Sequence, residues 1–230
     1  MCSRYTLTLN GENLLGLFEA EGIEDPSLPG WAPPRYNIAP TDNVPIYLES
    51  EKDGTVTSRL EVARWGLLFG GKRSGNPLIN TRVESLEGGT ALAGVFAKRR
   101  ALVPADGYYE WQKVGNQKQP YYFHGDEPLA FAGLYQWAKA EDGSWLLSTS
   151  VITRPPTEAA AAIHERMPLV LPRSFWSDWV DPTTEGSRTL LDAALAASDE
   201  IANALHAYPV GRAVGNVTNE GQELIAPLGA

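Results

Sequence analysis

The sequence predicts an α+β fold: a single compact domain with β-barrel-like antiparallel sheets flanked by short helices. Short runs of aromatic and β-branched residues recur along the chain with Gly and Pro between them, a pattern typical of antiparallel strands. Helical stretches are fewer, and the chain lacks the regular alternation of strands and helices that would indicate a parallel sheet. Because 230 residues with 43% hydrophobic content suffice for one core, we expect residues 1–230 to form one domain.

The expected strands are short, and turn-forming residues separate them. In chain order they cover residues 3–9, 44–48, 60–67, 101–103, 108–113, 121–123, 129–137, 145–152 and 169–171. The expected helices cover residues 12–19, 156–165, 174–179 and 198–206. The second helix begins at Pro156, because proline is tolerated in a first turn, and it ends before Pro168, which cannot continue a helix. The last helix has amphipathic spacing.

Neither a signal peptide nor a membrane-spanning run is visible. The start, MCSRYTLTLNGENLLGLF, lacks the basic and apolar regions of a signal peptide, and no apolar run is long enough to span a bilayer. Cys2 is the only cysteine, so it can form neither an intramolecular disulfide nor a thiolate metal cluster. We therefore expect a cytoplasmic protein that contacts no membrane and carries Cys2 as a free thiol.

Charge is distributed unevenly along the sequence. The net charge of −9 disfavours non-specific binding to nucleic acid, because an acidic protein repels a polyanion. Residues 59–118 nevertheless hold ten Lys or Arg and five Asp or Glu, which is a local charge of +5. This segment could form a surface for an anionic ligand, or its charges could be ordinary solvated ones.

Cys2 would become the N-terminal residue if Met1 were removed, as we expect. Its α-amine, with a pKa of about 8, and its thiol, with a pKa of about 8.5, would both be partly nucleophilic near neutral pH. The thiol can attack an acyl carbon with the amine as base. Alternatively, the amine can condense with an aldehyde before the thiol closes a thiazolidine ring. A cysteine at position two can also be incidental.

A carboxylate interrupts the aromatic segment at residues 103–111, VPADGYYEW. By strand alternation, Glu110 shares a face with Tyr108, whereas Tyr109 and Trp111 share the other face. Partial burial would raise the pKa of Glu110 towards that of a general acid or base. The alternative is an edge-strand glutamate that faces water.

His164 follows a run of small residues in segment 157–168, TEAAAAIHERMP. Alanine side chains would let this helix approach its neighbour closely. A histidine at a helix C-terminus is also a favourable partner of the helix dipole, so His164 taken alone can be structural. The other histidines, His124 and His206, have only a structural interpretation.

Two further segments carry polar side chains in short extended or turn regions. In residues 77–85, PLINTRVES, alternation places Asn80 and Arg82 on one face, where an amide and a guanidinium could hold a phosphate or sugar oxygen. The alternative is a charged strand face in solvent. Residues 37–41, NIAPT, form a turn that Pro40 makes rigid.

Together and in this order, these segments resemble the SOS response-associated peptidase (SRAP) family, whose members crosslink to abasic sites in single-stranded DNA. The resemblance covers nearly the whole chain. Matching segments are residues 1–5 (MCSRY), 36–41 (YNIAPT), 65–67 (WGL), 80–85 (NTRVES), 100–111 (RALVPADGYYEW), 131–135 (FAGLY), Thr153, 164–168 (HERMP) and, near the end, Val210 and Gly211.

The resemblance implies a compact α+β fold with a positively charged DNA cleft and the processed N-terminus at its floor. It implies that Cys2 crosslinks, that Asn80 positions the ring-opened sugar, and that Glu110 and His164 handle protons. The residues it places at the DNA are Arg4, Asn37, Pro40, Trp65, Arg82, Trp111, Thr153, Arg166 and Met167. It implies no cofactor and no metal ion, and a monomer that is nucleoid-associated when bound to DNA.

The chain departs from the family pattern at three places. Ser3 stands where the family commonly has Gly, and Ala101 replaces a frequent small residue or Cys. Residues 68–71, which follow the WGL segment, lack the usual Pro and Trp, and this puts the local DNA contacts in doubt.

The mechanism that the resemblance implies is a Schiff base between the Cys2 amine and the ring-opened sugar, followed by thiol addition to give a thiazolidine. A weak strand-cleaving lyase activity would be a side reaction of that Schiff base. Two alternatives stay open. One is an N-terminal-nucleophile cysteine peptidase that is autoproteolytic or cuts another protein. The other is a single-stranded DNA-binding module without chemistry.

Overall fold

The computed structural model describes residues 2–18, 34–69, 77–139 and 143–229. Within these residues the strands are β1 (Tyr5–Leu7), β2 (Arg35–Ile38), β3 (Asn43–Lys52), β4 (Thr55–Trp65), β5 (Asn80–Arg82), β6 (Arg100–Val114), β7 (Gln117–Lys139), β8 (Trp145–Arg154), β9 (Met167–Pro168) and β10 (His206–Pro209). The α-helices are α1 (Gly11–Phe18), α2 (Ala91–Lys98), α3 (Glu158–Ala161), α4 (Trp176–Val180) and α5 (Arg188–Ala204). Short 3-10 turns are η1 (Val83–Ser85), η2 (Arg173–Phe175), η3 (Arg212–Gly215) and η4 (Gln222–Ile225).

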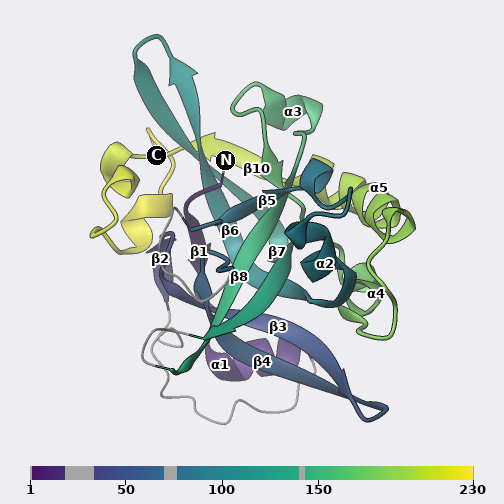
Figure 1. Cartoon of the computed structure of the whole chain (residues 1–230). Helices are drawn as coiled ribbons and strands as arrows, with labels where there is room; N and C mark the ends of the chain where they lie inside the picture. Colours follow the sequence, from purple (N-terminus) through teal and green to yellow (C-terminus); the bar gives the residue numbers. More distant parts are fainter. Residues whose placement is uncertain (1, 19–33, 70–76, 140–142, 230) are drawn as a thin grey trace.

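One mixed sheet forms the body of the protein, with the short helices around it (Figure 1). Its strand order is β10-β7-β8-β4-β3-β6-β1-β2, and β5 and β9 pair with β8 off this path. Because β6 also pairs with β7, the path from β7 through β8, β4 and β3 to β6 closes on itself. The predicted α+β class and barrel-like sheet are therefore confirmed. The sheet differs from the prediction in that β8 pairs in parallel with both β4 and β5.

Two long strands replace four of the predicted short ones. Residues 101–103 and 108–113 belong to the single strand β6, in which the register shifts between Ala105 and Gly107. Residues 121–123 and 129–137 likewise belong to β7. The turn-forming residues between the predicted pieces therefore mark irregularities within a strand and not its ends. As a result, β6 and β7 form a long hairpin that projects beyond the sheet (Figure 1).

Several helix predictions need correction. The helix expected at 156–165 is only Glu158–Ala161, so His164 lies in the turn that follows it. The last helix is longer than predicted, Arg188–Ala204, and His206 begins β10 instead of ending a helix. The first helix ends at Phe18, and the predicted residue 19 lies outside the described residues. Helix α2 was not predicted; its N-cap is Thr90, whose hydroxyl accepts from the backbone N–H of Ala93.

The core inside the sheet is strongly aromatic. Tyr5 contacts Trp65 edge to face at a centroid distance of 5.3 Å and Phe131 at 5.9 Å. Tyr108 stacks on Phe123 at 4.9 Å. Such pairs contribute about 0.5–1.5 kcal/mol each beyond the area they bury. They pack β1 against β4 and β7, and they pack β6, which carries the candidate acid or base, against β7.

The pairing of the strands brings distant segments to one place. Tyr5 lies opposite Tyr108, so the residues that precede β1 run alongside the later residues of β6. Asn80 of β5 lies opposite Val151 of β8. The strand β8 also pairs with β9, which follows the turn that contains His164. Among the described residues, no helix is long and apolar enough to cross a membrane.

Candidate active site beside the first strand

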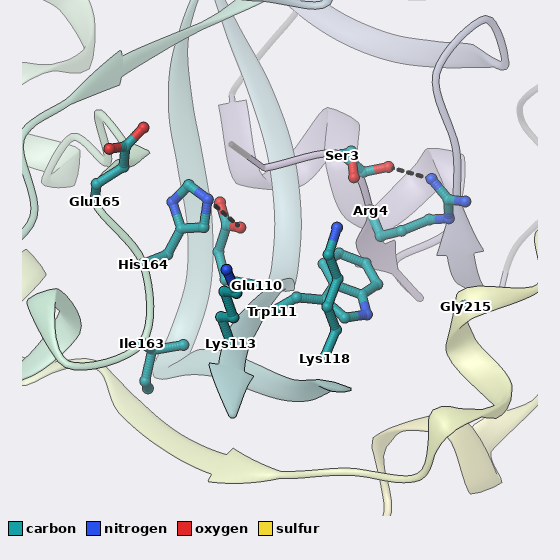
Figure 2. Close-up of a pocket in the computed structure, with 10 residues that line it drawn as sticks. All are labelled: Ser3, Arg4, Glu110, Trp111, Lys113, Lys118, Ile163, His164, Glu165 and Gly215. Atoms are coloured by element: carbon teal, nitrogen blue, oxygen red, sulfur yellow. Dashed lines mark hydrogen bonds and ion pairs between the residues drawn. The ribbon is translucent and has the colours of Figure 1, made fainter. Parts of the chain in front are cut away.

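A pocket of about 630 Å³ opens where these segments meet (Figure 2). Its lining combines residues that precede β1, the hairpin of β6 and β7, and the turn after α3. These residues are Ser3, Arg4, Glu110, Trp111, Lys113, Lys118, Ile163, His164, Glu165 and Gly215. The pocket therefore has two carboxyl groups, an imidazole, an indole and three cationic side chains around one space.

Cys2 lies in the core next to this pocket. Its side chain is fully buried, and the thiol donates to the carbonyl oxygen of Arg4 at a sulfur to oxygen distance of 3.6 Å. Burial is the main cause that raises the pKa of the Cys2 thiol, and the nearby carboxyl of Glu110 acts in the same direction. The thiol is therefore protonated at neutral pH.

The side chain of Asn80 holds the main chain of Cys2. The Asn80 side chain is 7% exposed, and its Nδ2 donates to the Cys2 carbonyl oxygen at 2.7 Å. Its Oδ1 is buried and has no hydrogen-bond partner among the described residues. A buried amide oxygen without a donor is costly, so this atom is ready to accept from a group that enters the site.

Glu110 and His164 face each other across the pocket (Figure 2). Their Oε2 and Nε2 atoms are 3.8 Å apart, and the side chains are 3% and 24% exposed. Burial raises the pKa of Glu110 to about 7 and lowers the pKa of His164. Burial therefore favours the uncharged form of both groups over an ion pair between them. Of the two interpretations of Glu110, burial and a water-facing edge strand, the structure supports burial.

The backbone of Arg166 contacts His164 at Nδ1. The Arg166 N–H nitrogen lies 3.1 Å from Nδ1, and the Arg166 carbonyl oxygen lies 3.3 Å from it. In the neutral tautomer that accepts from the Arg166 N–H, the proton lies on Nε2, the nitrogen that faces Glu110. In that tautomer a carboxyl group and an N–H donor face each other, a pair suited to moving protons on an oxygen-bearing ligand.

The three arginines that were expected to meet phosphate have different surroundings. Arg82 is exposed and has no hydrogen bond or ion pair within the described residues. Arg4 lines the pocket and donates to the carbonyl oxygen of Ser3 at 2.7 Å. Arg166 forms a bidentate ion pair with Glu84 at 2.8 and 3.0 Å and also donates to Thr153 O at 2.6 Å. Its guanidinium is therefore largely occupied within the protein.

Several other residues expected at the DNA lie in the interior. Trp65 is fully buried and its indole N–H donates to Ile79 O at 2.9 Å, so it supports the core. Thr153 and Met167 are also buried, because β8 and β9 turn their side chains inwards. The contact of these three residues with DNA stays a prediction. Trp111 lines the pocket and Pro40 is half-buried at the turn after β2.

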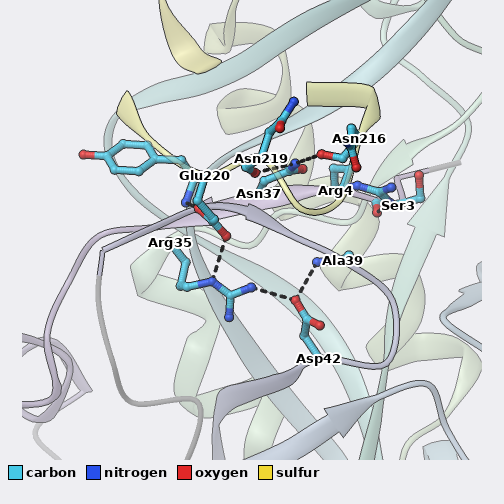
Figure 3. A network of polar contacts seen from close by, with 10 residues as sticks. Ser3, Arg4, Arg35, Asn37, Ala39, Asp42, Asn216, Asn219 and Glu220 are labelled. Carbon is cyan, nitrogen blue, oxygen red and sulfur yellow. Dashed lines mark hydrogen bonds and ion pairs between the residues drawn. The ribbon is translucent and has the colours of Figure 1, made fainter. Parts of the chain in front are cut away.

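The side chain of Asn37 forms hydrogen bonds within the protein (Figure 3). Its buried Nδ2 donates to the carbonyl oxygens of Asn216 and Asn219 at 2.9 and 3.0 Å. Nearby, Arg35 bridges Glu220 and Asp42 at 2.9 and 2.8 Å. These contacts hold the C-terminal segment against β2. That segment contributes Gly215 to the pocket, so Asn37 anchors a part of the chain that lines it.

The sequence interpretation missed Lys113 and Lys118, which line the pocket from the hairpin. It treated both as part of a generally basic segment. The signal that could have found them is the pairing of residues 111–113 with 118–120 around a tight turn, which places the two lysines opposite each other. Within the part of the chain that the structure describes, no group of three or more His, Cys, Asp or Glu could hold a metal ion.

Comparison with known proteins gives a consistent result. Residues 1–217 match the family model described as SOS response associated peptidase (SRAP). The chain is 33% identical to the abasic site processing protein YedK of Escherichia coli, over 99% of this chain and 100% of that protein. It is 31% identical to the abasic site processing protein YoaM of Bacillus subtilis, over 98% and 97%.

Solved structures support the same fold. A protein from Bacteroides thetaiotaomicron superposes with a TM-score of 0.78 at 20% identity, over 98% of this chain and 99% of that one. A phage-related protein from Bordetella bronchiseptica gives a TM-score of 0.68 at 29% identity, over 92% and 95%. The fold of the described residues is thus shared along nearly the full length of both proteins.

Proposed function

Because the chain belongs to the SOS response-associated peptidase family, we propose that it processes abasic sites in single-stranded DNA and crosslinks to them through Cys2. Relatives at about the same length are named abasic site processing proteins. Residues 1–230 act as one domain and as a monomer. The reaction begins once Met1 has been removed, since the nitrogen of Cys2 is an amide while Met1 is attached.

The first step opens the sugar. An abasic deoxyribose exists mainly as a cyclic hemiacetal, and the aldehyde appears when the anomeric hydroxyl loses its proton and the ring oxygen gains one. Glu110 as carboxylate takes the first proton, and the Nε2–H of His164 gives the second. The observation that carries this assignment is the pair itself: Glu110 Oε2 and His164 Nε2 lie 3.8 Å apart on the wall of the pocket beside Cys2.

The second step joins protein and DNA. The unprotonated amine of Cys2 adds to the aldehyde carbon, and loss of one water leaves an imine. The thiol then adds across the C=N bond: a sulfur to carbon bond forms, and the thiol proton passes to the nitrogen. The product is a five-membered thiazolidine, and one water has been released overall. Because the thiol is protonated in its buried site, it brings the proton that this closure needs.

Asn80 keeps the nucleophile in place. Its Nδ2 fixes the Cys2 carbonyl, and its unpartnered Oδ1 can accept from the Cys2 amine or a sugar hydroxyl. Holding the two reactants together converts a bimolecular reaction into an effectively intramolecular one. Arg4 and the exposed Arg82 supply positive charge for the phosphates, so binding tolerates any sequence and weakens with salt.

The test is a crosslinking assay with an oligonucleotide that carries one abasic site. The protein without Met1 is incubated with single-stranded DNA and analysed on a denaturing gel. A shifted band that resists denaturation and disappears in Cys2→Ala supports the proposal. The absence of a band with the unsubstituted protein, verified by intact mass to lack Met1, refutes it. Cleavage of a peptide without a DNA band would favour a peptidase, and reversible DNA binding alone would favour a module without chemistry.

A further inference from the structure

We propose that Lys113 and Lys118 form a phosphate-binding pair that holds the DNA strand where it leaves the abasic nucleotide. This inference rests on the proposed function, and it adds a contact to that function at the hairpin of β6 and β7. The ligand group is a phosphodiester of the strand whose abasic sugar enters the pocket.

The register of the hairpin places the two lysines opposite each other. Lys113 of β6 lies directly opposite Lys118 of β7, so both side chains leave the same face of the hairpin. Both lysines are exposed, and neither forms an ion pair within the described residues. Like charges directly opposite each other destabilise a strand pair. An anion between them would remove this repulsion.

The pair lines the pocket that holds Glu110 and His164 (Figure 2). Lys118 also affects the electrostatics of that site. Burial is the main cause that lowers the pKa of His164, and the positive charge of Lys118 adds to this effect. The ammonium group of Lys118 is thus close enough for its field to reach the imidazole. A phosphate bound at the pair would lie in the same pocket as a sugar bound at Glu110.

Trp111 connects the pair to the pocket. It precedes Lys113 by two residues on the same face of β6 and also lines the pocket, where its ring is half-buried. Bases of single-stranded DNA stack on such rings, whereas the backbone follows neighbouring cations. An indole followed by two cations therefore fits a nucleotide that flanks the abasic site better than it fits an isolated anion.

The test uses an oligonucleotide with a tetrahydrofuran analogue, which has no aldehyde and cannot crosslink. Binding of the unsubstituted protein, Lys113→Gln/Lys118→Gln and Lys113→Arg/Lys118→Arg is measured over a range of salt concentrations. The matched control is Lys52→Gln/Lys139→Gln, which removes two exposed lysines that do not line the pocket. We expect the first variant to bind about tenfold more weakly and the plot of log K against log salt to flatten by about 0.7, because one phosphate contact to a single strand contributes about 0.7.

The arginine variant should restore both affinity and slope, and the control should match the unsubstituted protein. Equal slopes for the glutamine variant and the control would overturn the inference, as would an equal loss in both. Oligonucleotides shortened on the 5′ or 3′ side of the analogue locate the contact: shortening one side should abolish the difference between the unsubstituted and glutamine proteins. A difference that survives both truncations would also overturn it. The crosslinking assay above tests the proposed function separately, because it reads the aldehyde reaction and not the salt slope.

Discussion

The side-chain amide of Asn80 donates a 2.7 Å hydrogen bond to the main-chain carbonyl of Cys2. The two residues are 78 positions apart in the chain and meet because β5 is placed beside β8 and the N-terminal segment runs along β6. The bond fixes the main chain of Cys2, the proposed nucleophile, without engaging its nitrogen or its sulfur. Its removal should therefore affect crosslinking more than folding.

Asn80→Ala should lower the rate of crosslinking to a single-stranded abasic oligonucleotide by about tenfold to a hundredfold, because misplacement of a reacting group is costly. Stability should fall by about 1–3 kcal/mol, since the carbonyl of Cys2 loses its donor in a buried place. Denaturing gels and urea unfolding measure the two effects. Asn203→Ala is the control, because that exposed amide also donates to a main-chain carbonyl, at 2.8 Å. An equal rate loss in both variants would contradict a positioning role for Asn80.

Glu110 should make the stability of the protein depend on pH. Its folded pKa of about 7 lies above its usual value of 4.5 because burial disfavours the charged form. The folded state therefore holds this proton more tightly than the unfolded state. The contribution of this proton to the free energy of unfolding is fully present below about pH 4.5 and is lost as pH rises through about 7. Gln cannot ionise and does not suffer this loss.

Glu110→Gln should thus gain stability relative to the unsubstituted protein between pH 5 and pH 8, by up to about 3 kcal/mol at about 1.4 kcal/mol per pKa unit. Urea unfolding at several pH values measures the difference. Glu51→Gln, at an exposed carboxylate, should show no such trend. In the crosslinking assay the unsubstituted protein should become faster as pH rises through about 7, and this inflection should be absent from Glu110→Gln. Parallel pH profiles would show that Glu110 does not supply the base.

Local pattern predicted part of this site and failed where contacts are long-range. Strand alternation predicted that Glu110 shares a face with Tyr108 but left open whether that face is buried. A run of alanines favours a helix up to residue 165, yet the helix ends at Ala161 and the following turn lets the Arg166 N–H reach His164. Helix propensity does not report such a competing contact.

The position of Trp65 illustrates a second limit. The segment that contains it could be matched by resemblance, but whether an indole faces solvent depends on how β4 meets β8 and where Ile79 presents its carbonyl. Cross-strand register likewise decides that Lys113 meets Lys118. The first relation joins residues that are distant in sequence, and the second depends on the turn between two strands. Composition and spacing along one strand reveal neither.

Substitution of Arg82 and of Arg166 should have different effects, because Arg82 is expected to contact phosphate and Arg166 to position the turn at His164. Arg82→Gln removes an exposed cation and should flatten the salt dependence of binding to the tetrahydrofuran oligonucleotide by about 0.7. Arg166→Gln removes a guanidinium that Glu84 and Thr153 already occupy, so the slope should stay unchanged. Its crosslinking rate should fall by about tenfold, because the turn that orients His164 loses an anchor. A flatter slope for Arg166→Gln would show that this arginine contacts phosphate.

Arg100 should be the strongest stability determinant outside the site. Its side chain is buried and donates only to main-chain carbonyls, namely those of Trp179 at 2.6 Å, Phe96 at 3.0 Å, Ala97 at 2.8 Å, Asp181 at 2.5 Å and Thr184 at 2.7 Å. These bonds join α2, α4 and the loop after α4. Arg100→Lys has too few donors and the wrong shape, so it should cost about 3–5 kcal/mol in urea unfolding. Arg99→Lys, at the exposed neighbour, should cost less than about 0.5 kcal/mol.

The amine and the thiol of Cys2 should be separable by substitution and by extension of the chain. Cys2→Ser keeps the amine after removal of Met1, so it should still form an imine that borohydride reduces to a stable band. Without reduction its band should be lost on heating, because no thiazolidine closes.

An uncleaved N-terminal extension keeps the thiol but turns the amine into an amide, and it should abolish the band with and without borohydride. The order of events follows from these two results, because the thiol has no imine to add to until the amine has reacted. A stable band from the extended protein would mean that the thiol attacks alone. Intact mass spectrometry of each protein verifies its N-terminus before the assay.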